Sequence, residues 1–274
     1  MAIKAYKPTS SGRRGMTVVD YSVLTKGKPE KSLTEMLRRH GGRDGHGRVS
    51  IRHRGGGAKR RYRLVELGPT QFFTGQAKSI EYDPNRSAFI SLVATKEGAK
   101  YYILSPQGIK PGDTVEYGEK TSVNPGNRMK LRSIPPGIPI HNVELIPGQG
   151  GRIARAAGNA TQILAKEGDY ATLKLPSGEV RTIHLDCYAS IGTLSNPDRK
   201  SVVIGKAGRM RHMGWRPHVR GKAMNPSSHP HGGGEGVNPI GLKYPKTFTG
   251  KQARGVKTRR PRKISDRFIM QGRK

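Results

Sequence analysis

The chain has 274 residues and a formal net charge of +32, with 51 Lys and Arg residues against 19 Asp and Glu residues. A charge of this size indicates a polyanionic partner, with nucleic acid first and an anionic membrane surface second. No apolar run approaches the roughly 18 residues that span a bilayer, so we expect no membrane-spanning segment. The single cysteine, Cys187, excludes an internal disulfide and a cysteine-based zinc site.

The charge is concentrated towards both ends of the chain. Residues 1–60 carry +11 and residues 201–274 carry +16, whereas residues 61–200 carry only +5. Neither charged end alternates its cations with Leu, Trp or Phe at helical spacing, which argues against a helix lying on a membrane. The first residues contain no apolar signal-peptide core, so we expect a protein that is cytosolic or is made and used inside an organelle.

Residues 1–60 form the predicted N-terminal extension, in which we expect one short helix. Ser32 can cap this helix, Glu35 follows three residues later, and Leu33 and Met36 would share one face. The rest of the extension is rich in glycine, which lets the backbone approach a phosphate, and in arginine, which can bind a phosphate bidentately. The alternative interpretation is a disordered basic tail.

Residues 61–124 change to short β-like runs separated by turn signals such as Gly68-Pro69. Five strands at this spacing predict a small closed or partly closed barrel, with the OB-fold as the candidate. The expected strands are Arg61–Leu67, Gln76–Tyr82, Ala88–Thr95, Ala99–Ser105 and Asp113–Gly118.

Residues 125–200 form a second strand-rich block, which begins at the Pro125-Gly126 boundary. Six short strands predict an SH3-like barrel, so we expect an all-β protein with an OB-fold barrel, an SH3-like barrel and long basic N- and C-terminal extensions. The expected strands are Met129–Ser133, His141–Ile146, Thr161–Ala165, Tyr170–Leu175, Val180–Leu185 and Tyr188–Ile191.

Residues 201–274 form the predicted C-terminal extension, with eighteen Lys and Arg residues, two acids, twelve glycines and six prolines. A segment so charged and so poor in large apolar groups cannot bury enough apolar surface to offset the entropy that it loses on becoming ordered. It needs a polyanion to neutralise it, and we expect a folded RNA. Trp215 would either stack on an exposed base or plug the second barrel, and the sequence does not separate these alternatives. The basic run at residues 257–263 fits phosphate binding or a nuclear localisation signal.

His229-Pro230-His231 is the one motif that invites a catalytic or metal-binding interpretation. Zinc generally needs four ligands, or three and a water, and Glu235 is the only acid nearby. A general base needs a carboxylate to orient it, and Glu235 is six positions beyond His229. We therefore predict no catalytic and no metal-ligating residues, and expect these histidines to donate N–H bonds to phosphate or ribose, or to stack on bases.

Several motifs stand in order along the chain: Lys7–Arg14, Gly41–Arg43, Gly47-Arg48, Arg52–Gly57, Tyr82–Ala88, Pro125–Asn127, His141–Glu144, Gly205–Gly208, Arg220–Pro226 and His229–Gly236. From about residue 6 to the end, they resemble the family of bacterial-type second proteins of the large ribosomal subunit. The sequence departs from the family pattern at Ser228, where an acidic residue is common, and at Lys222, where a small uncharged residue is common. The missing carboxylate further weakens the case for an activated His229.

The resemblance implies a primary rRNA-binding protein that supports subunit assembly, subunit association and tRNA binding, and lies near the peptidyl transferase centre. The implied partners are large-subunit rRNA, neighbouring ribosomal proteins and small-subunit rRNA at the subunit interface, within a bacterial or organellar ribosome. No cofactor and no intrinsic homo-oligomer are expected, and whether Mg²⁺ is bound through the rRNA is left open. A general DNA-binding protein is the alternative class, but the sequence has no helix-turn-helix, zinc module or dimerising heptad.

The predicted RNA-binding residues are mostly cations, with glycines and histidines between them. They are Arg13, Arg14, Arg43, Arg48, Arg52, His53, Arg54, Gly55, Gly56, Lys59, Arg60, Arg86, Lys206, Arg209, Arg211, Trp215, Arg216, Arg220, Asn225, His229, His231, Arg259 and Arg260.

Overall fold

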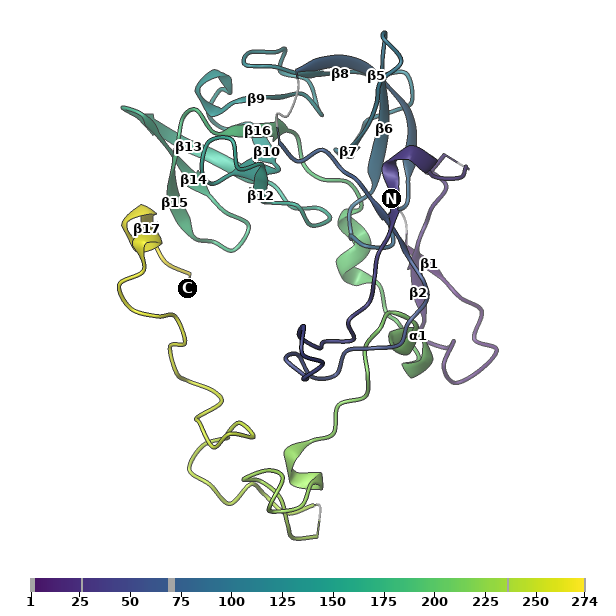
Figure 1. The fold of residues 1–274 in the computed structure, drawn as a ribbon, viewed down its shortest axis with the longest axis vertical. Coiled ribbons are helices and arrows are strands. Elements are labelled where there is room, and N and C mark those ends of the chain that lie inside the picture. Colours follow the sequence, from purple (N-terminus) through teal and green to yellow (C-terminus); the bar gives the residue numbers. More distant parts are fainter. Residues whose placement is uncertain (1–2, 26, 69–71, 236, 274) are drawn as a thin grey trace. The chain divides into compact units, whose positions relative to one another are not determined.

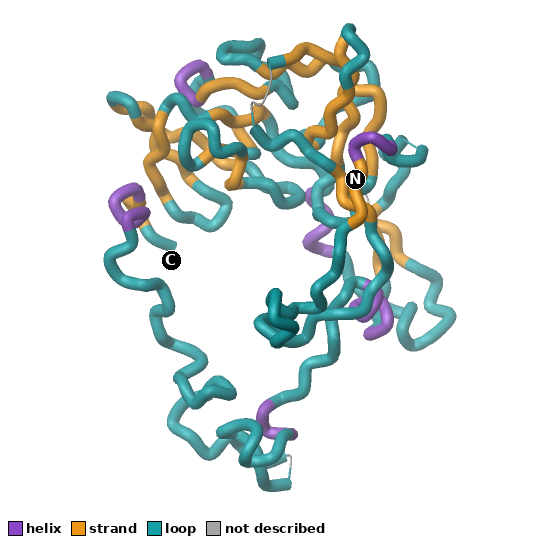
Figure 2. The backbone as a smooth tube through the Cα atoms, viewed as in Figure 1, coloured by secondary structure: helices purple, strands orange, loops and turns teal. Residues whose placement is uncertain are grey.

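The computed structural model describes residues 3–25, 27–68, 72–235 and 237–273. Its contacts divide the chain into two compact units. The larger unit comprises Met1–Arg38, Lys59–Ala207 and Ser265–Lys274, and the smaller unit comprises Arg39–Ala58 and Gly208–Ile264. Strands dominate the larger unit (Figures 1 and 2). In the described part of the chain, no helix is both long and apolar enough to cross a membrane.

The first barrel contains four of its five expected strands, which pair antiparallel in the spatial order β8-β5-β6-β7. A bulge in β5 between Ala77 and Ser79 shifts the alternation, so that Ala77 and then Ile80 are buried in the core. Gly75 lies so close to β6 that an added Cβ would come within 2.7 Å of the Ala94 carbonyl oxygen. The strands are β5 (Phe73–Glu81), β6 (Ile90–Thr95), β7 (Lys100–Leu104) and β8 (Thr114–Tyr117).

The remaining expected strand, Arg61–Leu67, is divided: its first residues pair outside the first barrel, whereas Val65 forms an isolated bridge to Tyr102 of β7. Only β4 (Arg61–Arg63) is a strand, and it pairs with β3 (Thr34–Met36). The prediction of a helix after Ser32 is therefore wrong: the structure has only one 3-10 turn there, η1 (Lys31–Leu33), which is followed by β3. The Ser32 hydroxyl bonds a neighbouring glutamate side chain and caps no helix, and pairing with a distant strand overrides the local helix signal.

Each of the six strand runs predicted for the second barrel contains a strand. The run after residue 129 ends in a 3-10 turn, η2 (Leu131–Ser133), and β12 was not predicted. Side chains such as Met129, Ile140 and Leu173 fill a core separate from that of the first barrel. The strands are β9 (Arg128–Lys130), β10 (Pro139–His141), β11 (Val143–Glu144), β12 (Gly151–Ile153), β13 (Thr161–Glu167), β14 (Tyr170–Lys174), β15 (Val180–His184) and β16 (Tyr188–Ile191).

The two barrels share one sheet, because β8 and β9 pair in parallel at Tyr117 and Arg128. An unpredicted C-terminal strand, β17 (Ile269–Gln271), pairs with β15 and extends this sheet at its other end. Among the described residues the sheet has eleven strands, in the order β17-β15-β14-β13-β10-β16-β9-β8-β5-β6-β7.

The N-terminal strands β1 (Ile3–Ala5) and β2 (Thr17–Val19) pair antiparallel. Thr17 donates its backbone N–H to the Val203 carbonyl, and Val203 donates its own to the Thr17 hydroxyl. The segment that leaves the second barrel is thereby fixed to β2. The remaining elements are η3 (Pro197–Ser201), α1 (Ala207–His212), η4 (Gly221–Ala223) and η5 (Ile264–Phe268).

His141 is a buried titratable group in β10, and its Nδ1 bonds the Gly192 carbonyl at 2.8 Å. Burial, together with the nearby Arg128 charge, lowers the pKa of His141 from 6.5 to about 4, although the bond to the Gly192 carbonyl acts in the opposite direction. Between these two values the unfolded chain binds the proton and the folded chain does not. The contribution of His141 therefore makes folding less favourable as pH falls from about 6.5 to about 4.

We predict that His141→Asn, which does not titrate, makes the free energy of unfolding less sensitive to pH over this window. Urea unfolding at a series of pH values measures the difference from the wild type, and the exposed His212→Asn serves as the control. Equal pH dependence in wild type and His141→Asn would contradict the prediction.

Candidate nucleic-acid interface

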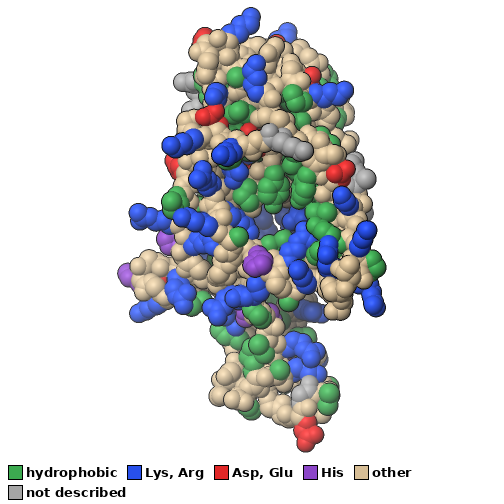
Figure 3. Space-filling model, turned by 90° about the vertical axis from the view of Figure 1, so that its right-hand side faces the viewer, with side chains coloured by type: hydrophobic (Ala, Val, Ile, Leu, Met, Phe, Trp, Pro, Cys, Tyr) green, Lys and Arg blue, Asp and Glu red, His purple; other side chains and the backbone are tan. Residues whose placement is uncertain are grey.

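The smaller unit brings together parts of the two predicted basic extensions. Its two segments contain nineteen Lys and Arg residues against two acids, Asp44 and Glu235, a balance of +17. None of its described residues is buried, so a hydrophobic core does not hold it together. Figure 3 shows one face of the protein, on which Lys and Arg side chains are spread widely and acidic side chains are few.

Backbone hydrogen bonds join the two segments of the smaller unit. Gly55 donates its N–H to the Gly214 carbonyl at 3.0 Å, and Ala58 donates to the His212 carbonyl at 2.8 Å. Between them, Gly57 has φ +88°, and an added Cβ would come within 2.8 Å of the Gly214 nitrogen. The glycine run predicted to approach phosphates therefore also allows the two segments to approach each other closely.

Two arginines of the first segment lie over aromatic rings of the second. The Arg54 guanidinium is 3.4 Å from the centroid of the Trp215 ring, and that of Arg52 is 4.0 Å from the Phe248 centroid. Trp215 is 41% exposed, so it does not act as a buried plug of the second barrel. An Arg on an aromatic face is a cation–π contact, and the exposed remainder of the indole is available for stacking.

The loop around His229 is held by its own histidines. His229 Nδ1 accepts the backbone N–H of His231 at 3.0 Å, and His231 Nε2 accepts that of Lys246 at 2.8 Å. These bonds select the Nε2-protonated tautomer of His229 and the Nδ1-protonated tautomer of His231. The His229 ring lies against Gly221, where an added Cβ would be 2.5 Å from the ring. Each ring thus keeps one N–H to donate, and its acceptor nitrogen is occupied.

Three of the predicted residues of the larger unit make internal contacts. The Arg13 guanidinium lies 5.2 Å from the Tyr6 ring centroid. The Arg60 guanidinium donates to the Pro84 carbonyl at 3.0 Å. Arg86 forms a 2.6 Å ion pair with the buried Asp83, so it contributes to the structure of its own loop.

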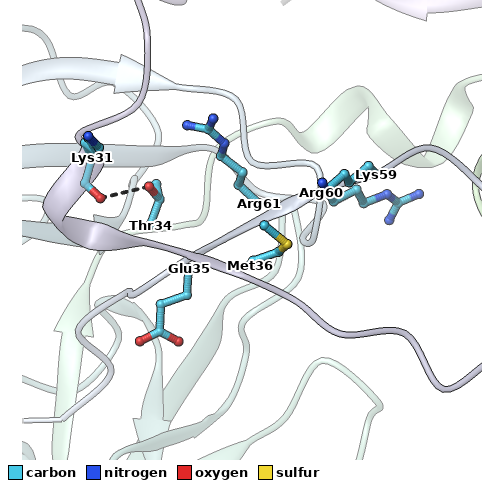
Figure 4. A pocket seen from close by; sticks show the side chains of 7 residues that line it. All are labelled: Lys31, Thr34, Glu35, Met36, Lys59, Arg60 and Arg61. Atoms are coloured by element: carbon cyan, nitrogen blue, oxygen red, sulfur yellow. Dashed lines mark hydrogen bonds between the residues drawn. The ribbon is translucent and has the colours of Figure 1, made fainter.

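A hollow of about 500 Å³ lies beside the β3–β4 ribbon. Figure 4 shows the Glu35 carboxylate pointing away from the Arg60 and Arg61 guanidinium groups. The hollow therefore presents cations and suits an anionic ligand such as a phosphate. Its lining residues are Lys31, Thr34, Glu35, Met36, Lys59, Arg60 and Arg61.

The predicted site residues divide unequally between the two units. Arg13, Arg14, Lys59, Arg60, Arg86 and Lys206 lie in the larger unit. The smaller unit holds Arg43, Arg48, Arg52, His53, Arg54, Gly55, Gly56, Arg209, Arg211, Trp215, Arg216, Arg220, Asn225, His229, His231, Arg259 and Arg260.

Sequence reasoning missed several residues of these sites. Arg39 donates to the carbonyls of Gly56, Gly57 and Ala58 and so fixes the glycine run, yet its only sequence signal was a cation upstream of that run. Phe248 was missed because its partner Arg52 is distant in sequence. Within the described residues, no cluster of three or more His, Cys, Asp or Glu side chains could hold a metal ion.

Two β-barrels that carry glycine- and arginine-rich segments of this charge define an RNA-binding protein with a structural role. The model described as Ribosomal Proteins L2, RNA binding N-terminal domain, matches residues 30–117, and that described as Ribosomal Proteins L2, C-terminal domain, matches residues 124–250. The chain therefore belongs to the ribosomal protein L2 family. It is a structural, RNA-binding protein of the large subunit of a cytoplasmic or organellar ribosome, and its partners are large-subunit rRNA and ribosomal proteins. The family resemblance and the OB-fold and SH3-like barrels expected from the sequence are confirmed.

Trp215 is the only tryptophan of the chain, so its fluorescence reports on the smaller unit. Because none of the described residues of that unit is buried, we predict that Trp215 emission reaches its unfolded value at a lower urea concentration than the far-UV circular dichroism of the barrels. Arg54→Met, which removes the cation–π contact, should lower only the fluorescence midpoint. Coincident transitions in the wild type would contradict this prediction.

Proposed function

We propose that this protein is a primary rRNA-binding protein that supports large-subunit assembly, association of the two subunits and binding of tRNA, and organises RNA near the peptidyl transferase centre. The observation that carries the proposal is the smaller unit, with a net charge of +17 and no buried residue among those described. A unit of this kind gains its stability from a polyanion, because phosphates neutralise its charge and supply the contacts that a core would otherwise supply.

The two barrels and the basic segments have different tasks in this proposal. The barrels, at residues 61–124 and 125–200, recognise the shape of folded rRNA through loops and edges. The extensions, at residues 1–60 and 201–274, enter gaps between RNA helices. Specificity comes from irregular or single-stranded RNA and from 2′-hydroxyl groups, since the A-form major groove hides base edges. The loop around His229 contacts RNA near the peptidyl transferase centre, and further contacts reach small-subunit rRNA at the interface.

Salt dependence of binding tests the role of the smaller unit. We predict that the double variant Arg259→Gln/Arg260→Gln lowers the slope of log affinity against log salt concentration by about 1 for each cation removed. Filter binding to large-subunit rRNA at several salt concentrations measures the slope. The control is Lys174→Gln, which removes an exposed cation from β14 of the second barrel and should leave the slope unchanged. A double variant with the wild-type slope would contradict the proposed role.

His229 has a structural role in this proposal and does not act as a general base. Its Nδ1 lone pair already accepts the His231 N–H, and its Nε2 carries the proton, so neither nitrogen is placed to take a proton from a substrate. The adjacent residue, Ser228, supplies no carboxylate to orient the ring. The competing hypothesis is acyl transfer assisted by His229.

The variant His229→Asn separates these two hypotheses, because its side-chain oxygen can replace Nδ1 as the acceptor but has no imidazole. We predict that assembled particles with His229→Asn form peptide bonds at near the wild-type rate, whereas His229→Ala reduces the yield of assembled subunits. Assembly is measured by sedimentation and peptide-bond formation by single-turnover kinetics on purified particles. Fully assembled His229→Asn particles that form no peptide bonds would establish a catalytic role.

A further inference from the structure

Two exposed tyrosines that the predicted site does not include form a pair on the larger unit. Tyr82 follows β5 and is 49% exposed, and Tyr21 follows β2 and is 38% exposed. Their ring centroids are 5.6 Å apart at an interplanar angle of 71°. Tyr21 also packs edge-on against the buried Phe89, at 6.2 Å. The tyrosine pair is therefore anchored to the core of the first barrel through Phe89, while both tyrosine side chains remain partly exposed.

The loop that carries Tyr82 is held rigidly. The buried Asp83 accepts the backbone N–H of Asn85 at 2.8 Å and pairs with Arg86. Ser87 is fixed from the second barrel, because its carbonyl accepts the Asn196 side-chain amide at 2.7 Å. A ring presented by such a loop loses little conformational entropy when it binds a ligand.

A basic segment is bonded to the turn that follows Tyr82. Arg60 donates to the Pro84 carbonyl, and the Arg61 carbonyl accepts the side-chain amide of Asn85, so the basic segment at residues 59–61 is bonded to the same turn. The same segment lines the hollow beside the β3–β4 ribbon. The acids next to the two tyrosines in the sequence are engaged locally. Glu81 accepts the hydroxyls of Ser79 and Tyr102, Asp83 is paired with Arg86, and Asp20 accepts the N–H and hydroxyl of Ser22.

We propose that Tyr82, supported by Tyr21, stacks on an unpaired base of large-subunit rRNA, and that the adjoining phosphates lie in the hollow lined by Arg60 and Arg61. The inference rests on the rRNA-binding role proposed above and adds a site to it. An exposed, anchored aromatic ring on a turn that the Arg60 guanidinium contacts offers what a splayed base and its phosphate need, a stacking surface near positive charge. The aromatic contact carries no charge, so its contribution is independent of salt.

The test compares variants of the full-length protein in binding to large-subunit rRNA at several salt concentrations, together with chemical probing of the bound RNA. We expect Tyr82→Leu to weaken binding about tenfold at every salt concentration, with an unchanged salt slope. One or a few unpaired nucleotides should become more reactive. Tyr82→Trp, which keeps a stacking surface, should retain affinity.

Tyr170 provides a matched control on the second barrel. It is 43% exposed and packs edge-on against His184 at 5.5 Å. Both Tyr170 and Tyr82 follow an acid in the sequence, so the two sites differ chiefly in the Arg60 guanidinium that is bonded to the turn after Tyr82. Tyr170→Leu should therefore bind rRNA like the wild type. Equal losses of rRNA affinity in Tyr170→Leu and Tyr82→Leu would overturn the inference, because the effect would then follow from removing any exposed tyrosine and would not be specific to Tyr82.

The remaining outcomes also decide the question. The inference would be overturned if Tyr82→Leu bound rRNA with wild-type affinity and left the nucleotide reactivities unchanged. It would also be overturned if the variant protein had a lower melting temperature and no nucleotide of the bound rRNA became more reactive. Unchanged rRNA affinity with poorer incorporation into subunits would assign the pair to a neighbouring ribosomal protein instead. If Arg259→Gln/Arg260→Gln keeps the wild-type slope while Tyr82→Leu loses affinity, the role proposed for the smaller unit fails and the stacking site stands.

Discussion

A buried ion pair stabilises β9, the strand of the second barrel that pairs with the first. The Arg128 guanidinium lies 3.2 Å from the Glu144 carboxylate, and their side chains are 1% and 0% exposed. Arg128 also donates to the Asn142 carbonyl, and Glu144 accepts the Tyr188 N–H. Either charge without the other would cost about 3–5 kcal/mol in this position. Arg128 is also the residue at which β9 pairs with Tyr117 of β8, so the ion pair stabilises the strand at which the two barrels meet.

The smaller unit uses weaker and more local interactions. Backbone bonds at the glycine run, guanidinium groups over Trp215 and Phe248, and histidines that accept backbone N–H groups hold it together. Each of these contacts leaves cations exposed, whereas a hydrophobic core would have required larger apolar side chains and fewer charges. The protein thus combines a larger unit built on buried apolar cores with a charged unit in which no described residue is buried.

The sequence predicted the features that depend on local pattern. Turn signals and alternation located four strands of the first barrel and all six runs of the second, since these strands pair mostly with their neighbours. The same reasoning did not predict β3, the β15–β17 pair or the contact between Arg54 and Trp215, because each joins segments far apart in the chain. Composition predicted RNA contacts for the histidines but did not predict that each ring also accepts a backbone N–H of its own loop.

The attachment of the basic C-terminal segment at both ends has a topological consequence. Val203 is bonded to β2 and β17 is bonded to β15, so the intervening chain is a closed loop and not a free tail. A closed loop has less conformational entropy than a free tail of the same length, so it loses less entropy when it becomes ordered. In the intact chain, β17 pairs with β15 intramolecularly, at a high effective concentration. A single proteolytic cut within the loop would make this short pairing bimolecular, so that the fragment carrying β17 would dissociate on dilution. The stability of the β15–β17 pairing therefore depends on an uncut backbone between Val203 and β17.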